Sequence, residues 1–335
     1  MKVKLKMLLP VVLTGVLMLS GCGAKSAKDV TEDLANKVNN MQSYQTDATM
    51  TFDHNGKKQV YLVKIDFKKP SYYRVALTDS HKQNQQMILR NVSGVYVLTP
   101  QLNKSYRFES NWPNNRSQAY LFNTLVKDIT TDSNLSFKAK DNQYIFKTKT
   151  NYNTTQLDNQ TITFNKNLTP QKVEVRDKSQ KIIITVRFTH FKFNPNLDNK
   201  TFDVKQNMTA AEIKSSAAAA ADSSTFKVAY PTATINGAKL AIMKPEVSAA
   251  GEKYILKYTG KNPFTLIETK SEKADSAQPT LAAGDPANLG FAVGTVSDNT
   301  LSWSYGGTDF MLASNALNQE ELITVAQSVN GTIVK

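Results

Sequence analysis

The chain has 335 residues and one cysteine, and its 41 Lys and Arg against 28 Asp and Glu give a formal charge of +13. A single cysteine excludes an internal disulfide, so stability must come from core packing, and the length allows two domains of ordinary size. The three histidines, His54, His81 and His190, lack a second His or Cys at ligand spacing, so we expect no metal site.

The first 21 residues are typical of an export signal. Three lysines precede an apolar run over residues 7–19, which is shorter than the roughly 20 residues of a membrane-spanning helix. The following Leu19-Ser20-Gly21-Cys22 resembles the lipobox of bacterial lipoproteins, in which the cysteine is alkylated with diacylglycerol. We therefore predict a signal peptide over 1–21 and a lipid anchor at Cys22, on the extracytoplasmic face of the membrane. An ordinary secretory signal with an incidental cysteine is the alternative.

Basic charge is concentrated in the first half of the chain. Residues 22–222 contain 29 Lys and Arg against 18 Asp and Glu, a net charge of +11, whereas residues 223–335 contain 9 against 10. Beside a membrane, such a surface is attracted to anionic headgroups or wall polymers, and a merely solvated basic face is the alternative. The lysines are scattered without a helix-turn-helix, zinc spacing or aromatic RNA-binding pattern, so we expect no nucleic-acid partner.

A helix followed by a long antiparallel meander is predicted for the first 200 residues. Ser26 and Asp29 form a capping-box pattern ahead of a helix over 27–41. The apolar period then changes to two, and Asn55-Gly56 is typical of a hairpin turn. The meander is interrupted by one amphipathic helix, predicted over 116–129. The expected strands are 45–52, 57–67, 72–77, 86–90, 95–99, 105–109, 136–139, 144–147, 160–165, 171–176, 182–188 and 190–193.

The second half begins with a predicted linker. Thr209 to Glu212 is a capping-box pattern and residues 217–221 are all alanine, so a short helix is expected within 208–224, with a flexible linker as the alternative. The expected elements beyond it are strands 239–243, 253–258, 264–269, 300–305 and 308–313, a polar loop over 272–288, a hairpin turn at Gly306-Gly307, and a final helix capped by Asn318 and Glu321 that stops at Gly331.

No motif of a catalytic class is present. The chain lacks a G-x-S-x-G elbow, a P-loop and a G-x-G-x-x-G loop. Paired carboxylates at Glu32-Asp33 and Glu320-Glu321 lie near the starts of predicted helices, where they interact favourably with the helix dipole. We expect no catalytic residue and no cofactor, hence a protein that is not an enzyme.

Several spaced motifs resemble the LolA-like lipoprotein carriers, most closely the Gram-positive sporulation and germination lipoproteins of the YdcC and GerS type. The motifs are Phe67 to Val75 (FKKPSYYRV), Asn91 to Pro100 (NVSGVYVLTP), Leu102 to Tyr106, Trp112-Pro113, Ser117 to Leu121 and Phe202-Asp203-Val204. Residues 254–260, 303–307 and 320–328 resemble a small uncharacterised domain at the ends of Gram-positive membrane-linked lipoproteins.

This resemblance implies an α+β fold: a strongly curved, antiparallel, incomplete β-barrel with covering helices over an apolar concavity. The predicted domains are the barrel over 22–207 and a small α+β domain over 225–335, joined by the Ala-rich linker. In LolA an arginine before the proline of the first motif helps to hold the helical lid closed. Lys69 occupies that position here, and lysine lacks the planar fork of arginine.

The predicted function is that of a membrane-anchored, non-enzymatic binding protein. A hydrophobic ligand such as a lipid, an acyl chain or a lipopeptide would lie in the concave face. The candidate ligand-binding residues are Tyr61, Val63, Ile65, Lys69, Tyr73, Val75, Leu121 and Leu125. The alternative, suggested by the germination lipoproteins, is a docking or regulatory partner of an envelope enzyme such as a cell-wall amidase. An empty cavity of a few hundred Å³ would favour the first hypothesis, and a packed interior the second.

Overall fold

The structure, a computed structural model, describes residues 25–54, 56–80, 85–114, 116, 118–152, 156–216, 228–232, 237–248 and 251–329. The predicted signal peptide, Cys22, the alanine run over 217–221 and Gly331 lie outside these ranges. Within the described residues, no helix is long and apolar enough to cross a membrane.

A large open sheet of 12 strands forms the first half of the molecule, in the order β15-β6-β5-β4-β3-β2-β1-β11-β10-β9-β8-β7. Its strands are β1 (Ser43–His54), β2 (Lys57–Lys68), β3 (Tyr72–Asp79), β4 (Gln85–Asn91), β5 (Gly94–Thr99), β6 (Lys104–Phe108), β7 (Ser136–Lys140), β8 (Gln143–Lys149), β9 (Leu157–Asn165), β10 (Pro170–Asp177), β11 (Ile182–Phe193) and β15 (Thr280–Leu281). All neighbouring strands are antiparallel except β15, which pairs in parallel with β6.

A second antiparallel sheet has seven strands in the order β12-β13-β14-β19-β18-β17-β16. They are β12 (Lys239–Ser248), β13 (Gly251–Thr259), β14 (Phe264–Lys270), β16 (Asp285–Asn288), β17 (Val293–Val296), β18 (Thr300–Tyr305) and β19 (Thr308–Ala313). Both sheets are open and mostly antiparallel. Together with the helices they form an α+β fold, as the sequence predicts.

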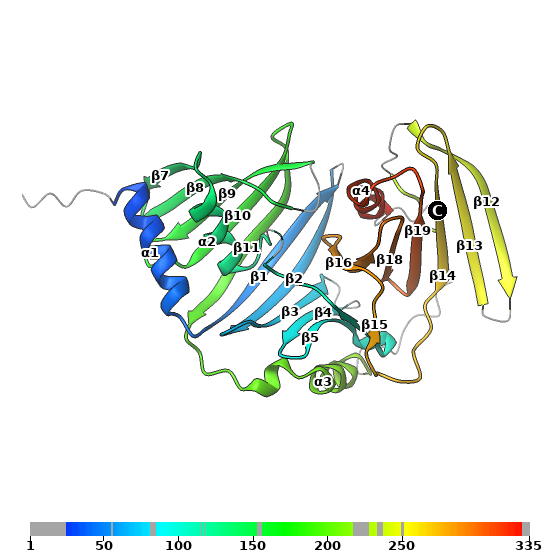
Figure 1. Ribbon diagram of the computed structural model, residues 1–335, viewed down its shortest axis with the longest axis horizontal. Helices are drawn as coiled ribbons and strands as arrows, with labels where there is room; N and C mark the ends of the chain where they lie inside the picture. The colour runs from blue at the N-terminus through cyan, green and yellow to red at the C-terminus, as the bar shows by residue number, and fades with distance from the viewer. Residues whose placement is uncertain are drawn as a thin grey trace, which may run out of the picture.

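The helices cover the sheets on particular faces. They are α1 (Ala27–Asn40), α2 (Phe122–Thr131), α3 (Val204–Ser216) and α4 (Gln319–Val329), with short 3-10 turns at Pro100–Leu102 and Asn199–Phe202. Helices α1 and α2 lie on one face of the large sheet, near β7 and β8, and α4 packs on the smaller sheet (Figure 1). Met208 of α3 packs on the opposite face of the large sheet, against Ala76, Leu89 and Leu98.

Local patterns at helix ends and tight turns are confirmed. The Ser26 hydroxyl accepts the Asp29 backbone N–H at 3.2 Å, and the Asp29 carboxylate accepts the Ser26 N–H at 2.9 Å, so α1 begins where predicted. Asn318 and Glu321 make the same reciprocal pair at 3.0 Å each before α4. The β18–β19 turn places Gly306 and Gly307 at positive φ (59° and 77°), where a Cβ would be strained.

Five predicted features of the chain path are wrong. Helix α2 begins at Phe122 rather than near residue 116, because the Thr124 hydroxyl donates to the carbonyls of Gln118 and Leu121 and holds a buried turn there. Residues 182–193 form one strand with a bulge, in which His190 has φ 52°, rather than two strands. Thr209 does not cap a helix but lies inside α3, where its hydroxyl donates to the Lys205 carbonyl.

The remaining two errors concern short strands whose pairing is distant in sequence. The loop predicted over 272–288 contains β15 and β16, and β17 was not predicted. Strand β15 and the residues on either side of it are held by β6 and by the turn that precedes β6. The N–H of Ala282 donates to the Arg107 carbonyl at 2.8 Å, and the N–H of Ala274 donates to the Leu102 carbonyl at 2.8 Å. No local apolar pattern specifies such a strand, because partners from another part of the chain stabilise it.

The two sheets share contacts along their junction. Buried side chains of the large sheet, such as Phe52 and Ile88, belong to one continuous apolar cluster with Leu289, Phe291 and Ile323 of the second half. Lys104 and Asp309 form an ion pair across the junction at 2.7 Å. The predicted division into domains at 22–207 and 225–335 therefore stays a prediction.

Candidate functional site

The concave face of the large sheet, where the ligand groove was predicted, is filled by the protein's own aromatic side chains. Phe122 of α2 is fully buried, and its ring lies 5.3 Å from that of Phe193 and 6.1 Å from that of Tyr44. Tyr44 in turn stacks on Phe191 at 5.3 Å and lies 5.2 Å from Phe67. These rings come from β1, β2, β11 and α2, so strand and helix together close the face.

The seven apolar candidate residues all lie in this packed core. Each is at most 3% exposed: Tyr61, Val63, Ile65, Tyr73, Val75, Leu121 and Leu125. The first five come from β2 and β3, whose inward positions alternate as the sequence pattern predicts, and the last two come from α2 and the residue before it. The structure thus brings these residues together, and their role in ligand binding stays a prediction.

Lys69 contacts the end of a covering helix. Its Nζ donates a hydrogen bond to the Asn39 backbone carbonyl in the last turn of α1, and its own backbone N–H donates to the Gln42 carbonyl at 2.8 Å. A cation is favourable at a helix C-terminus, where the carbonyls lack partners within the helix. Lys69 therefore holds α1 against the strand end of β2 through a single ammonium, without the fork of an arginine.

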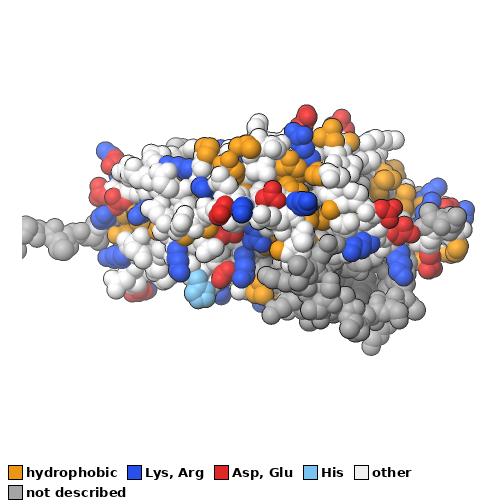
Figure 2. Space-filling view, turned by 90° about the horizontal axis from the view of Figure 1, so that it is seen from below, with side chains coloured by type: hydrophobic (Ala, Val, Ile, Leu, Met, Phe, Trp, Pro, Cys, Tyr) orange, Lys and Arg blue, Asp and Glu red, His pale blue; other side chains and the backbone are white. Residues whose placement is uncertain are grey.

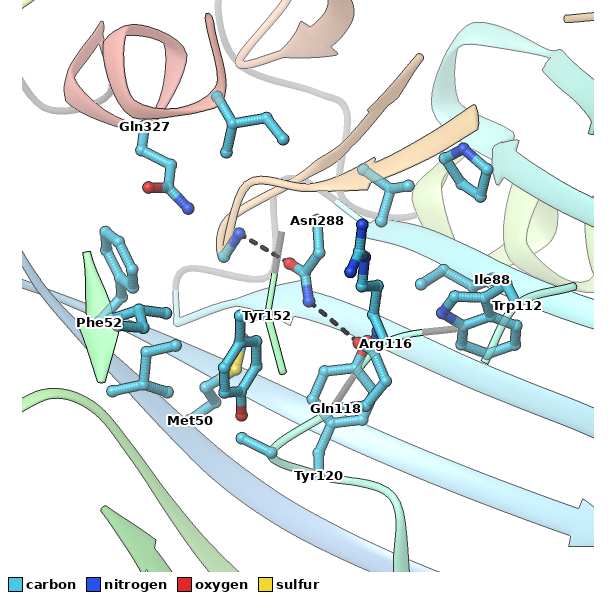
Figure 3. Close-up of a pocket in the computed structure, with 17 residues that line it drawn as sticks. Met50, Phe52, Ile88, Trp112, Arg116, Gln118, Tyr120, Tyr152, Asn288 and Gln327 are labelled. Atoms are coloured by element: carbon cyan, nitrogen blue, oxygen red, sulfur yellow. Dashed lines mark hydrogen bonds between the residues drawn. The ribbon is translucent and has the colours of Figure 1, made fainter. Parts of the chain in front are cut away.

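A cavity of about 50 Å³ lies at the junction of the two halves. It opens between β1, β4 and β11 of the large sheet, the segment after β6, and β16, β17 and α4 of the second half (Figure 3). The lining side chains include Met50, Phe52, Ile88, Trp112, Arg116, Gln118, Ala119, Tyr120, Tyr152, Asn288, Ile323 and Gln327. One water needs about 10–15 Å³ by such a measure, so the space holds a few waters or one small side chain.

Hydrogen bonds fix the second half against the wall of this cavity. The Asn288 amide donates to Gln118 Oε1 at 3.3 Å, and its Oδ1 accepts the N–H of Gly290 at 2.8 Å (Figure 3). Gln86 of β4 accepts the N–H of Val293 at 2.7 Å. A Cβ on Gly290, which has φ 84°, would lie 3.1 Å from the Phe52 ring, so the backbone approaches β1 closely there.

Two tyrosine hydroxyls at the cavity wall have no hydrogen-bond partner among the described residues. They belong to Tyr120 and Tyr152, and each hydroxyl oxygen is buried. Burial raises the pKa of both phenols, so they are neutral donors at physiological pH. Buried polar groups are rarely left unpaired, so these hydroxyls would gain a partner only if the side chains around them moved. Arg116, which is exposed, donates to Asn151 Oδ1 at 3.4 Å and supplies a cation at the cavity.

Sequence reasoning missed this cavity. Its lining comes from segments far apart in the chain. Of the lining residues, Trp112, Gln118, Ala119 and Tyr120 fall within motifs quoted for the carrier resemblance, and Ile323 and Gln327 within the segment 320–328 quoted for the C-terminal domain. The usable signal was the cluster of large aromatic and amide side chains in an irregular segment before α2. That segment belongs to no strand, so pairing within the large sheet does not explain why its side chains are buried. Within the described residues, no group of His, Cys, Asp or Glu is placed to hold a metal ion.

The comparisons with known proteins identify the family. The family model described as "Sporulation protein YdcC-like" matches residues 2–202. The chain is 44% identical over 321 residues to "Sporulation protein YdcC" of Bacillus subtilis (strain 168), an alignment that covers 95% of each protein. The chain belongs to the YdcC-like family of sporulation proteins, as the motif resemblance predicted.

Solved structures give weaker likenesses. The chain is similar to the LolA superfamily protein NE2245 from Nitrosomonas europaea, with 14% identity and a TM-score of 0.30 over 54% of this chain and 98% of that one. It is also similar to a chain in the complex of the CwlD amidase from Clostridioides difficile with the GerS lipoprotein, with 15% identity and a TM-score of 0.24 over 51% and 98%. Scores this low do not establish a common fold, so the family membership rests on the sequence matches.

Proposed function

We propose that this sporulation-family protein is a lipid-anchored, extracytoplasmic docking protein, which binds an envelope protein rather than carrying a lipid. The anchor would be Cys22, and the partner would insert a side chain into the junction cavity. A cell-wall enzyme such as an amidase is the partner class that the motif resemblance suggests. The observation that carries the proposal is the size of the cavity, about 50 Å³ on a concave face whose other parts are filled by aromatic side chains.

The small volume of the cavity favours the docking hypothesis over the lipid-carrier hypothesis. Sites for lipids and drug-sized molecules usually measure about 300–1,000 Å³. An acyl chain could enter the concave face only if α1 and α2 moved away and exposed the aromatic rings around Phe122. The hydrophobic-ligand hypothesis thus requires an opened state, whereas insertion of one side chain does not.

The composition of the cavity also favours a protein partner. Tryptophan, tyrosine and arginine are the residues most enriched at binding hot spots, and the lining contains Trp112, Tyr120, Tyr152 and Arg116. A partner carboxylate would lie near the Arg116 guanidinium.

Site-specific photocrosslinking in sporulating cells tests this proposal. A photoreactive residue at position 116 should crosslink one envelope protein, whereas the same residue at Val92, which is 84% exposed in the β4–β5 turn, should not. Ala119→Leu, which places a larger side chain in the cavity, should abolish the crosslink while leaving the melting temperature nearly unchanged. Saturable binding of a fluorescent fatty acid by the purified protein, with no position-specific crosslink, would instead support a lipid carrier.

A further inference from the structure

The outward face of the large sheet, opposite α1 and α2, is polar and basic. Inward positions of β1, β2 and β7–β11 are buried, as at Val63, Phe146 and Val186, and the alternate positions point to the other side. Helix α3 packs over β3–β5 on this outer side, and the remaining strands are not covered by it. Figure 2 shows one side of the molecule, on which Lys and Arg side chains are interspersed with Asp and Glu, hydrophobic and other side chains.

Six exposed cations on these strands form what we call the basic face: Lys64 (β2), Lys138 (β7), Lys147 and Lys149 (β8), and Arg187 and Lys192 (β11). Within the described part of the chain, none of them lies within 4 Å of a carboxylate. Their charge is therefore not neutralised by short ion pairs with the protein's own acids.

Several carboxylates on the same strands have polar or basic partners of their own. Glu174 lies 2.9 Å from both Lys172 and Arg176, and this pairing lowers its pKa against the opposing effect of burial. Asp53 lies 3.4 Å from Lys181. Asp47 lies 3.4 Å from the imidazole of His190. The basic face thus keeps a net positive field.

The face is broad and carries few bulky side chains. In the register of the strands, Arg187 lies opposite Lys172 on β10 and opposite Thr49 on β1, and Lys147 lies opposite Thr161 on β9. From β2 to β7 there are six strand spacings, about 29 Å at roughly 4.8 Å each. Charges spread this widely, with threonines between them, suit an extended anionic surface better than a single small anion.

We propose that the basic face lies on an anionic phospholipid surface and orients the protein on the membrane. The predicted anchor is compatible with this orientation. Helix α1, which follows the predicted anchor in sequence, starts at the end of the molecule where β7 and β8 lie (Figure 1). The docking cavity at the opposite end of the large sheet would remain accessible to a partner.

Vesicle binding of residues 25–335, which include every described element and lack the anchor, tests the proposal. Partition onto phosphatidylcholine vesicles containing 30% phosphatidylglycerol should exceed that onto pure phosphatidylcholine and should weaken as salt rises. The triple variant Lys138→Gln, Lys147→Gln, Lys149→Gln should bind the anionic vesicles about 100-fold less tightly, since each cation near such a surface contributes about a factor of five.

A matched variant controls for total charge. Lys239→Gln, Lys257→Gln, Lys261→Gln removes three exposed lysines from the second half and should reduce binding by less than about fivefold. Equal losses in both triple variants would overturn the proposal, as would a lack of preference for phosphatidylglycerol. Binding of the parent to a soluble glycerol-phosphate polymer, without binding to vesicles, would overturn it in favour of a wall polymer. Because no partner protein is present, the result does not depend on the docking function.

Discussion

Glu268 offers a test of the electrostatics inside the smaller sheet. Its side chain is fully buried on β14, opposite Tyr254 on β13 and Phe310 on β19. Oε2 accepts the backbone N–H of Ala229 at 2.9 Å, and Oε1 has no partner among the described residues. Burial raises the pKa of this carboxyl from 4.5 to about 7, and the hydrogen bond from Ala229 offsets part of the rise.

The sign of the pH effect follows from proton binding. Below pH 4.5 the carboxyl is protonated in both the native and the unfolded chain. Between pH 4.5 and about 7, only the native carboxyl keeps its proton, so the unfolded state gains stability as pH rises. Each pH unit is worth about 1.4 kcal/mol, so Glu268 lowers the free energy of unfolding by about 3 kcal/mol between pH 4.5 and about 7. Above about pH 7 the carboxyl is ionised in both states, and its contribution no longer changes with pH.

Glu268→Gln removes this titration while keeping the shape of the side chain and the acceptor for Ala229. We expect the variant to resemble the parent near pH 4.5 and to be more stable by about 3 kcal/mol at pH 8. Urea denaturation at half-unit steps from pH 4.5 to 8.5 measures the difference. The exposed Glu272→Gln variant should follow the parent at every pH. A stability difference that stays constant with pH, or a parent that is more stable at pH 8, would refute the reasoning.

Three further predictions test the parts that position the site. Phe122→Ala should lower the free energy of unfolding by about 3–5 kcal/mol in urea, because the ring is fully buried, whereas Phe122→Leu should cost less than half as much. Asn318→Ala should cost about 1 kcal/mol in the same assay and Asn318→Asp almost nothing, since the aspartate can still accept the Glu321 N–H. Lys69→Met should cost about 1 kcal/mol, because the Asn39 carbonyl loses its donor. Hydrogen exchange should then accelerate in the last turn of α1 and not in α4; uniform acceleration would contradict a local role.

The helix ends and hairpins were predictable because their interactions are local. Ser26 with Asp29, Asn318 with Glu321 and the paired glycines at 306 and 307 each involve groups within three residues of one another. The alternation of β2, with Tyr61, Val63 and Ile65 on one side, likewise follows from strand geometry alone. Tyr73 and Val75 of β3 are buried for the same reason, and the role of these residues in ligand binding stays a prediction.

Whether that inward face is empty or filled was not predictable. The alternation that would line a groove is the same alternation that lines a core, and here Phe122, Phe191 and Phe193 fill the space over Tyr44. The start of α2 was placed too early, because the Thr124 hydroxyl donates to the carbonyls of Gln118 and Leu121 and holds a turn where a continuous helix was predicted. The predicted anchor at Cys22 lies outside the described residues and remains a prediction from its local motif.

By itself the sequence determined the α+β class, most strands, the capped ends of α1 and α4, and membership of the YdcC-like family. Each of these depends on short-range geometry or on motifs a few residues long. Tertiary structure alone decided that β15 pairs with β6, that the concave face is closed, and that a small cavity remains where β1, β4, β16 and α4 meet. These features depend on contacts between segments far apart in the chain, such as Gln86 with Val293, 207 residues apart, and the packing of side chains at such contacts is not encoded in any local pattern.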